Sequence, residues 1–161
     1  MVQITQGEDT MMRINKLTDY GIVVMTRIAD MDQNRVHTAR EISEDTRIPL
    51  PTVTRLLKTL SGNGLLNSQR GSQGGYSLSR SSKDISVANI IETFEGPIAL
   101  TECSTNACEC AYETKCSVEE PWQKINDTVK NALEGISLNQ MTGKNQNEGL
   151  LNLSMNYSGG M

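Results

Sequence analysis

The sequence predicts a mainly α-helical fold in which a short β-hairpin follows the third helix. Two observations support this fold class. The chain has 37% hydrophobic residues but only one Trp and one Phe, so we expect a core of Leu, Ile, Val and Met, which favours packed helices over a β-sandwich. Apolar residues in several segments also recur at the spacing of a helix face, whereas residues 65–78 read as two short strands around a glycine-rich turn.

The first two of the three helices that precede the hairpin are expected within residues 18–48. Thr18-Asp19 is suited to an N-cap, and the apolar face of residues 22–29 follows it. A second, short helix opens with the capping box of residues 38–41, in which Thr and Glu satisfy each other's backbone amides. This helix should end before Pro49, which disfavours helical geometry at the preceding residue. The sole histidine, His37, is interpreted as a surface or cap residue rather than a ligand.

The third helix is expected to start with Pro51, since proline suits the first helical position. Its apolar stripe repeats at i, i+3, i+4 and i+7 and consists of Val53, Leu56, Leu57 and Leu60. Its other sides are polar and basic. A short helix, a turn and a second helix with a basic outer face form a helix-turn-helix.

The hairpin directly after this helix has the place of a wing. Residues 65–70 are predicted as a strand, 71–75 as a glycine-rich turn and 76–78 as the returning strand. A phosphate-cradling nucleotide loop is the alternative interpretation of the turn, but no Lys-Ser/Thr pair follows and the next element is a strand. Small residues at the tip would let the backbone approach a phosphate or enter the minor groove of DNA.

Charge is distributed unevenly along the chain. The net charge is −4, yet residues 47–83 contain six basic residues and no acidic one, whereas eleven acids and four lysines follow from residue 84 onward. This asymmetry indicates an anionic partner for one segment only. The predicted contacts to double-stranded DNA are Thr38, Pro51, Thr52, Thr54, Arg55, Lys58, Arg70, Gly71, Ser72, Gln73, Gly74, Gly75 and Tyr76.

All four cysteines, Cys103, Cys108, Cys110 and Cys116, fall within fourteen residues, among Ser, Thr, Asn, Glu and Lys. Core cysteines would be scattered on apolar faces, so this group indicates metal or redox chemistry. Gaps of four, one and five residues do not match the two C-x2–4-C knuckles of a structural zinc site. Iron–sulfur clusters accept irregular spacing, and a thiol–disulfide switch at residues 108–110 is a further, strained alternative.

The chain has no run of 18 apolar residues, and its first ten residues are polar and acidic rather than a secretory signal. We therefore expect a cytoplasmic protein without a membrane partner. Thiols are kept reduced in that compartment, which favours metal binding over structural disulfides.

Several separated segments resemble a known family. They are Lys16–Gly21, Pro51–Leu60, Arg70–Tyr76, Glu95–Ser104 and Trp122–Asn126. They resemble the iron–sulfur-dependent winged helix-turn-helix transcription regulators, which control Isc and Suf cluster-assembly operons or act as nitric-oxide-sensing repressors. The last two segments are similar to the proteobacterial Suf-operon regulators in particular. The resemblance covers about residues 12–141.

This resemblance implies a homodimer with a recognition helix in the major groove and a wing in the minor groove. It also implies three cysteine ligands for an iron–sulfur cluster, with 2Fe–2S favoured over 4Fe–4S. Cys103, Cys110 and Cys116 match best, because the last gap of five residues recurs in the family. Cys103, Cys108 and Cys116 would match the nitric-oxide branch instead.

Two further positions bear on the ligand set. Glu119 stands where the Isc regulators have a histidine ligand, so this chain departs from their pattern. Asp19 matches a carboxylate that the other subunit donates in the nitric-oxide branch, although it is also interpreted as a helix-capping acid.

The predicted organisation has three parts. A winged helix-turn-helix DNA-binding domain covers 12–84, and 142–161 form a disordered Asn-, Gly- and Ser-rich tail. Between them, 85–141 hold a short helix capped by Ser86 and ended by Gly96-Pro97, the cluster-binding loop, and a long helix from Pro121. The apolar stripe of this long helix, from Trp122 to Ile136, suits packing on its own core or pairing with a symmetry mate.

The sequence therefore predicts a sequence-specific DNA-binding transcription regulator that senses iron–sulfur cluster status and controls cluster-assembly genes. The alternatives are a winged-helix regulator that uses zinc or a direct thiol switch, and a nitric-oxide-responsive repressor of the same family. An enzyme is not expected, because the chain has no C-x-x-C motif, one badly placed histidine and no nucleotide-binding loop.

Overall fold

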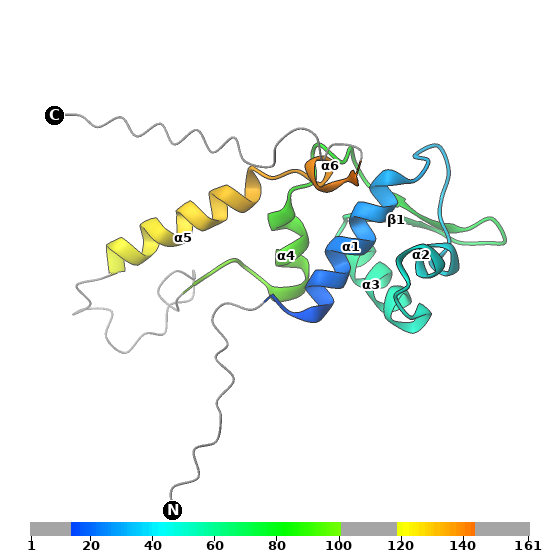
Figure 1. The fold of residues 1–161 in the computed structure, drawn as a ribbon, viewed down its shortest axis with the longest axis horizontal. Coiled ribbons are helices and arrows are strands. Elements are labelled where there is room, and N and C mark those ends of the chain that lie inside the picture. The colour runs from blue at the N-terminus through cyan, green and yellow to red at the C-terminus, as the bar shows by residue number, and fades with distance from the viewer. Residues whose placement is uncertain (1–13, 101–118, 144–161) are drawn as a thin grey trace, which may run out of the picture.

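The structure, a computed structural model, describes residues 14–100 and 119–143. All four cysteines lie outside these residues, as do residues 144–161. The elements are, in order, α1 (Lys16–Asp30), α2 (Ala39–Thr46), α3 (Leu50–Gly62), β1 (Leu66–Gln69), β2 (Gly75–Leu78), α4 (Val87–Glu95), α5 (Glu119–Glu134) and α6 (Leu138–Met141). The predicted mainly α-helical fold with a hairpin after the third helix is therefore confirmed (Figure 1).

Helix α1 lies at the centre of the core and contacts α2, α3, α4 and α6. Its inward face presents Val24, Met25 and Ile28, which are fully buried. They belong to one cluster with apolar side chains of the other elements, among them Ile42, Val53, Leu56, Leu57, Leu60, Ile85, Ile90 and Leu138. Burying a side chain of this size stabilises a fold by about 1.5–3 kcal/mol, so this cluster holds the helix-turn-helix to α1.

Helix α1 begins earlier than Thr18-Asp19, and the predicted cap is wrong. Asn15 is the N-cap, and its side-chain oxygen accepts a hydrogen bond from the Leu17 amide at 3.0 Å. Thr18 is fully buried, and its hydroxyl donates to Glu95 Oε1 on α4 at 2.5 Å. A tertiary contact with α4, rather than local capping chemistry, therefore occupies Thr18.

The helix-turn-helix follows the predicted pattern closely. Thr38 and Glu41 form the capping box of α2, with the Glu41 amide donating to Thr38 Oγ1 at 3.2 Å. Arg47 ends α2 in the left-handed region, with φ 59° and ψ 20°. Helix α3 starts at Leu50, so Pro51 is its second residue rather than its first. Proline is tolerated there because an amide in the first turn has no intrahelical acceptor.

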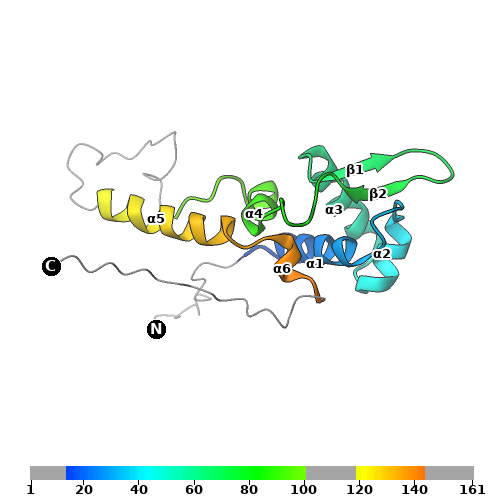
Figure 2. The same cartoon turned by 90° about the horizontal axis from the view of Figure 1, so that it is seen from above.

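The hairpin pairs Leu66 with Leu78 and Gln69 with Gly75 in antiparallel register. Leu66 and Leu78 pack on the core. Because side chains alternate along a strand, Gln69 and Ser77 belong to the opposite, outer face. Figures 1 and 2 both show the hairpin and α5 at opposite ends of the molecule.

Helix α4 has its predicted cap at Ser86 and its predicted end at Gly96. Helix α5 runs from Glu119 to Glu134, so Ile136, which was expected on its apolar stripe, lies beyond the helix. The long C-terminal helix itself is confirmed.

The segment after α5 returns to the helical body. Its backbone pairs with the segment before α4, with the Leu138 amide donating to Ile85 O at 2.7 Å and the Val87 amide to Ile136 O at 2.9 Å. Leu138 is fully buried and Thr142 is 4% exposed. The expected disordered tail from 142 is therefore wrong at its first residue, because α6 packs against α1.

Candidate nucleic-acid interface and sensor segment

The recognition-helix candidate α3 turns its cations outward. Its apolar stripe is buried, which leaves Pro51, Arg55 and Lys58 exposed on the far side. Thr52 and Thr54 are half-buried on its flanks. Within residues 14–100 and 119–143, neither Arg55 nor Lys58 forms an ion pair. These charges are therefore available to a phosphate or a base.

The wing presents a second set of predicted contacts. Arg70, Gly71, Ser72 and Gln73 are exposed, and Arg70 also has no ion pair in the described part of the chain. Gly71 has φ +113°, a conformation that side chains with a Cβ rarely adopt. The turn at the wing tip thus requires glycine at this position.

His37 fastens the wing to the helix-turn-helix. The His37 amide donates to Tyr76 O at 2.9 Å, and the Tyr76 amide donates to His37 O at 2.8 Å. The Tyr76 ring is half-buried and packs against the core. Tyr76 therefore anchors the base of the wing, and its expected contact with DNA stays a prediction.

The interpretation of His37 as a surface or cap residue is wrong, because it is 1% exposed. Its Nε2 lies 2.8 Å from Asp32 O, and since a carbonyl only accepts, Nε2 carries the proton. Its Nδ1 has no hydrogen-bond partner within the described residues and faces Glu41 Oε1 at 3.6 Å. One sequence signal was available: the residue before a capping box often packs against the first turns of the helix.

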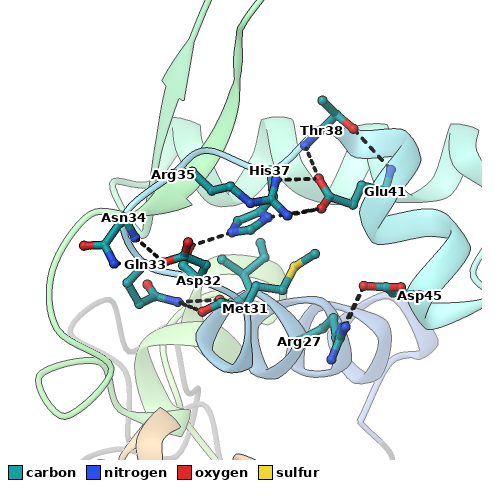
Figure 3. A network of polar contacts seen from close by, with 11 residues as sticks. Arg27, Met31, Asp32, Gln33, Asn34, Arg35, His37, Thr38, Glu41 and Asp45 are labelled. Atoms are coloured by element: carbon teal, nitrogen blue, oxygen red, sulfur yellow. Dashed lines mark hydrogen bonds and ion pairs between the residues drawn. The ribbon is translucent and has the colours of Figure 1, made fainter.

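Glu41 is the centre of a polar network at the start of α2 (Figure 3). Arg35 Nη2 contacts its Oε1 at 2.5 Å and Arg35 Nη1 its Oε2 at 3.3 Å. The hydrogen bond from Arg35 lowers the pKa of the Glu41 carboxyl below its usual range and raises the pKa of Arg35. The carboxylate also accepts from the Thr38 amide at 3.4 Å. One side chain thus caps α2 and orients a guanidinium.

A groove of about 550 Å³ brings several predicted contacts together. It lies between the α1–α2 connection and the outer face of the wing. Thr38 lines one side of it, and Ser72, Gln73 and Gly74 line the other. Thr38 and the wing are more than thirty residues apart in sequence, and only the folded chain makes them neighbours.

Asp19 lies in the first turn of α1 and is exposed. Its carboxylate has no ion pair or side-chain hydrogen bond among the residues that the structure describes. It borders a pocket of about 760 Å³ together with Ile14, Lys16 and Ile22. An unpaired oxygen donor is thus accessible at this end of α1.

The predicted cysteine ligands, Cys103, Cys108, Cys110 and Cys116, fall outside the described residues. Both neighbouring segments are well anchored. On one side Glu95 Oε1 accepts from Thr18 and from the Asn15 amide, the latter at 2.9 Å. The Leu100 amide then donates to Asn126 Oδ1 of α5 at 3.0 Å, and Asn126 is 6% exposed. No group of three or more potential metal ligands occurs within the described ranges.

Comparison with known proteins identifies the family. Residues 14–144 match the Rrf2 family model, described as an iron-dependent transcriptional regulator. The chain belongs to the Rrf2 family. It is therefore a DNA-binding transcription regulator, and like its relatives it is not an enzyme.

Two curated relatives illustrate the likeness of this Rrf2 protein. An HTH-type transcriptional regulator of Azotobacter vinelandii, ORF2, is 30% identical over 92% of this chain and 90% of its own length. The IscR regulator of Xenorhabdus nematophila is 30% identical over 84% of this chain and 81% of its own. The expected similarity to the Suf-operon branch within the family stays a prediction.

Solved structures of the family share the fold. CymR of B. subtilis, named as its global cysteine regulator, matches with a TM-score of 0.65 and 25% identity over 83% of this chain and 98% of its own. IscR of T. potens matches with a TM-score of 0.61 and 25% identity over 81% and 85% of the two chains. In this Rrf2 protein, none of the described helices is long and apolar enough to cross a membrane.

Proposed function

We propose that this Rrf2 protein is a homodimeric transcription regulator that senses iron–sulfur cluster status through its cysteines and controls cluster-assembly genes. The observation that carries the proposal is the concentration of all four cysteines between residues 103 and 116. This segment lies between α4 and α5, which are in contact with each other. We expect the regulator to act in the cytoplasm, where its thiols are reduced.

The donor set fits an iron–sulfur cluster. Cys103 and Cys116 are the outer ligands, with Cys110 or Cys108 as the third. Asp19, donated by the other subunit, is the candidate for the remaining position, and its accessible carboxylate, unpaired among the described residues, supports this role. When bound, a cluster supplies an inorganic core whose integrity depends on iron supply, oxidants and nitric oxide. We expect the 2Fe–2S form.

The end of α4, which leads toward the ligand segment (residues 103–116), packs against the DNA-binding body. Glu95 ties the end of α4 to Thr18, one residue before Asp19. The Phe94 ring packs against Gly21 of α1, where a Cβ would lie 2.3 Å from Phe94 Cε2. A change in the ligand segment would therefore be transmitted to α1, on which α3 packs. In coupling of this kind, the bound cluster changes the relative stability of two arrangements of the protein.

Exposed apolar side chains support a homodimer through α5. Trp122 is 39% exposed and Ile125 is 47% exposed on this helix. Ile14, just before α1, and Val23 on α1 are 51% and 39% exposed. A second copy of the chain would cover these groups and place two α3 helices about one turn of DNA apart, as a two-fold operator requires.

CymR supports a second sensing mode. This relative, whose name refers to cysteine regulation, has the same fold as the present chain. The fold alone therefore does not specify the signal. Zinc binding or a direct thiol switch at the same cysteines is the alternative function, and a nitric-oxide-responsive repressor is the alternative within the cluster-binding mode.

Anaerobic purification followed by absorbance, iron and sulfide analysis tests the proposal. We expect coloured protein with iron and acid-labile sulfide, and loss of the visible absorbance in Cys116→Ala. Two results would contradict cluster sensing. One is colourless protein that contains zinc. The other is operator binding that is equally strong before and after thiol oxidation and iron removal. Operator binding by the apoprotein and holoprotein, compared under the same conditions, measures the direction of the response.

A further inference from the structure

Arg35 lies at the groove between the α1–α2 connection and the wing, and it is absent from the predicted DNA contacts. Its side chain is 54% exposed. Among the residues that line the groove, Arg35 is the one with a charged side chain. The others carry amide or hydroxyl groups, apart from Val36 and Gly74. The lining thus carries one positive charge, no carboxylate and many hydrogen-bonding groups.

Glu41 holds the guanidinium of Arg35 in place but does not occupy all of its hydrogen-bond donors. Each of its two Nη atoms makes one contact with Glu41. A guanidinium has five N–H donors in a rigid plane, so three donors stay available to a second oxygen ligand. Glu41 is itself fixed by the capping box of α2. Figure 3 shows the Arg35 side chain reaching toward Glu41 at the start of α2, close to the His37 ring.

The groove is continuous with the predicted DNA surface. Thr38 at the start of α2 and the wing residues Ser72 and Gln73 line it together with Arg35. Gln69 and Ser77 extend it along the outer face of the hairpin. A DNA strand that contacts the wing and the start of α2 at the same time must cross this groove.

We infer that the groove seats the sugar–phosphate backbone of one DNA strand and that Arg35, oriented by Glu41, contacts a phosphate there. The inference rests on the DNA-binding function of the protein. An amide- and hydroxyl-rich lining with a single preorganised cation suits phosphate and sugar oxygens, which position a protein on DNA without reading its sequence. Nothing in the lining offers the aromatic surface on which an unstacked base would stack.

The test compares Arg35→Gln with Arg27→Gln as a matched control. Arg27 is also a partly exposed arginine in an ion pair, with Asp45 at 2.7 Å, but it does not line the groove. We expect Arg35→Gln to weaken binding about tenfold, because a charge-assisted hydrogen bond is lost. The slope of log affinity against log salt should become shallower by about one unit. Arg27→Gln should change neither quantity.

A second variant separates orientation from net charge. Glu41→Gln keeps a capping-box residue but loses the ion pair with Arg35. Because it removes a negative charge, a purely electrostatic account predicts tighter binding to DNA. Orientation of Arg35 by Glu41 predicts weaker binding instead. Tighter binding by Glu41→Gln would overturn the orienting role of Glu41.

Neutral methylphosphonate groups placed one at a time along the operator locate the contact. We expect one position to weaken binding of the wild-type protein while leaving Arg35→Gln unaffected. Equal affinity, salt slope and methylphosphonate profile for wild type and Arg35→Gln would overturn the inference. A wild-type protein that prefers no duplex over random competitor would instead contradict the proposed function itself. Thermal melting of each variant verifies that it is folded.

Discussion

His37 and Tyr76 exchange both of their backbone hydrogen bonds, at 2.9 and 2.8 Å, and so join the wing to the residue before α2. Gly75 makes this approach possible. A Cβ at this position would lie 2.7 Å from His37 O. The wing and the segment that leads into α2 are therefore held by one contact between backbones, which leaves no space for a side chain.

Gly75→Ala should displace the wing. The new methyl group would meet the His37 backbone, which cannot move without breaking the pairing with Tyr76. We expect a loss of about 1–3 kcal/mol in unfolding free energy and weaker operator binding. Chemical denaturation measures the first and fluorescence anisotropy the second. Gly62→Ala, where no atom lies within 4 Å of the added Cβ, is the control and should be neutral or stabilising.

Arg55, Lys58 and Arg70 should each contribute to DNA affinity without supporting the fold. Each is exposed and lacks an ion pair in the described chain. Replacing a phosphate-contacting one with Gln should weaken binding to all sequences and reduce the salt slope by about one unit. Replacing a residue that reads a base would instead relax the sequence preference at one operator position. Titrations at several salt concentrations distinguish these outcomes, and unchanged slopes for all three would exclude this surface.

Glu95→Ala should destabilise the junction between α1 and α4. The buried Thr18 hydroxyl would lose its acceptor, and an unsatisfied buried polar group costs about 1–3 kcal/mol. Thr18→Val removes the donor instead. If the two residues act as a pair, the double variant should lose less stability than the sum of the single losses. Additive losses in urea denaturation would show that the contact carries no coupling energy.

Stability should fall at acidic pH partly through Glu41. Its folded-state pKa lies below the unfolded value because Arg35 hydrogen bonds to the carboxylate. The stabilisation is therefore complete above the ordinary carboxyl range, near pH 4.3, and is lost as pH falls through the lowered folded value. Urea midpoints measured from pH 7 down to pH 3 should show a smaller acid loss for Glu41→Gln than for the wild type. Parallel curves would contradict the contribution of Glu41.

Ile125→Glu should weaken self-association. Ile125 is 47% exposed on α5, and the proposed dimer would bury it. A carboxylate there would have to be desolvated against an apolar surface. Sedimentation equilibrium should report monomer at concentrations where the wild type is a dimer, with unchanged helix content. Lys124→Gln, a change on the same helix at a side chain that is 75% exposed, should leave the association intact.

Much of the fold was determined by local sequence patterns. The buried stripe of α3, the capping box at Thr38 and the end of α4 at Gly96 follow from periodicity and capping chemistry. The hairpin also follows from local signals, since Gly71 requires a positive φ in the turn. These features depend on residues within a few positions of one another, which is the range over which sequence patterns are informative.

Contacts between distant segments were decided only by the tertiary structure. Thr18 does not cap α1, because its hydroxyl donates a hydrogen bond to Glu95, 77 residues away. His37 is buried because Tyr76 pairs with its backbone. Thr142 joins the body because α6 packs against α1. The sequence alone established a basic helix-turn-helix, a glycine-rich wing and a cysteine group. Only the folded chain determined how these parts are joined, because burial and hydrogen-bond pairing depend on neighbours in space rather than in sequence.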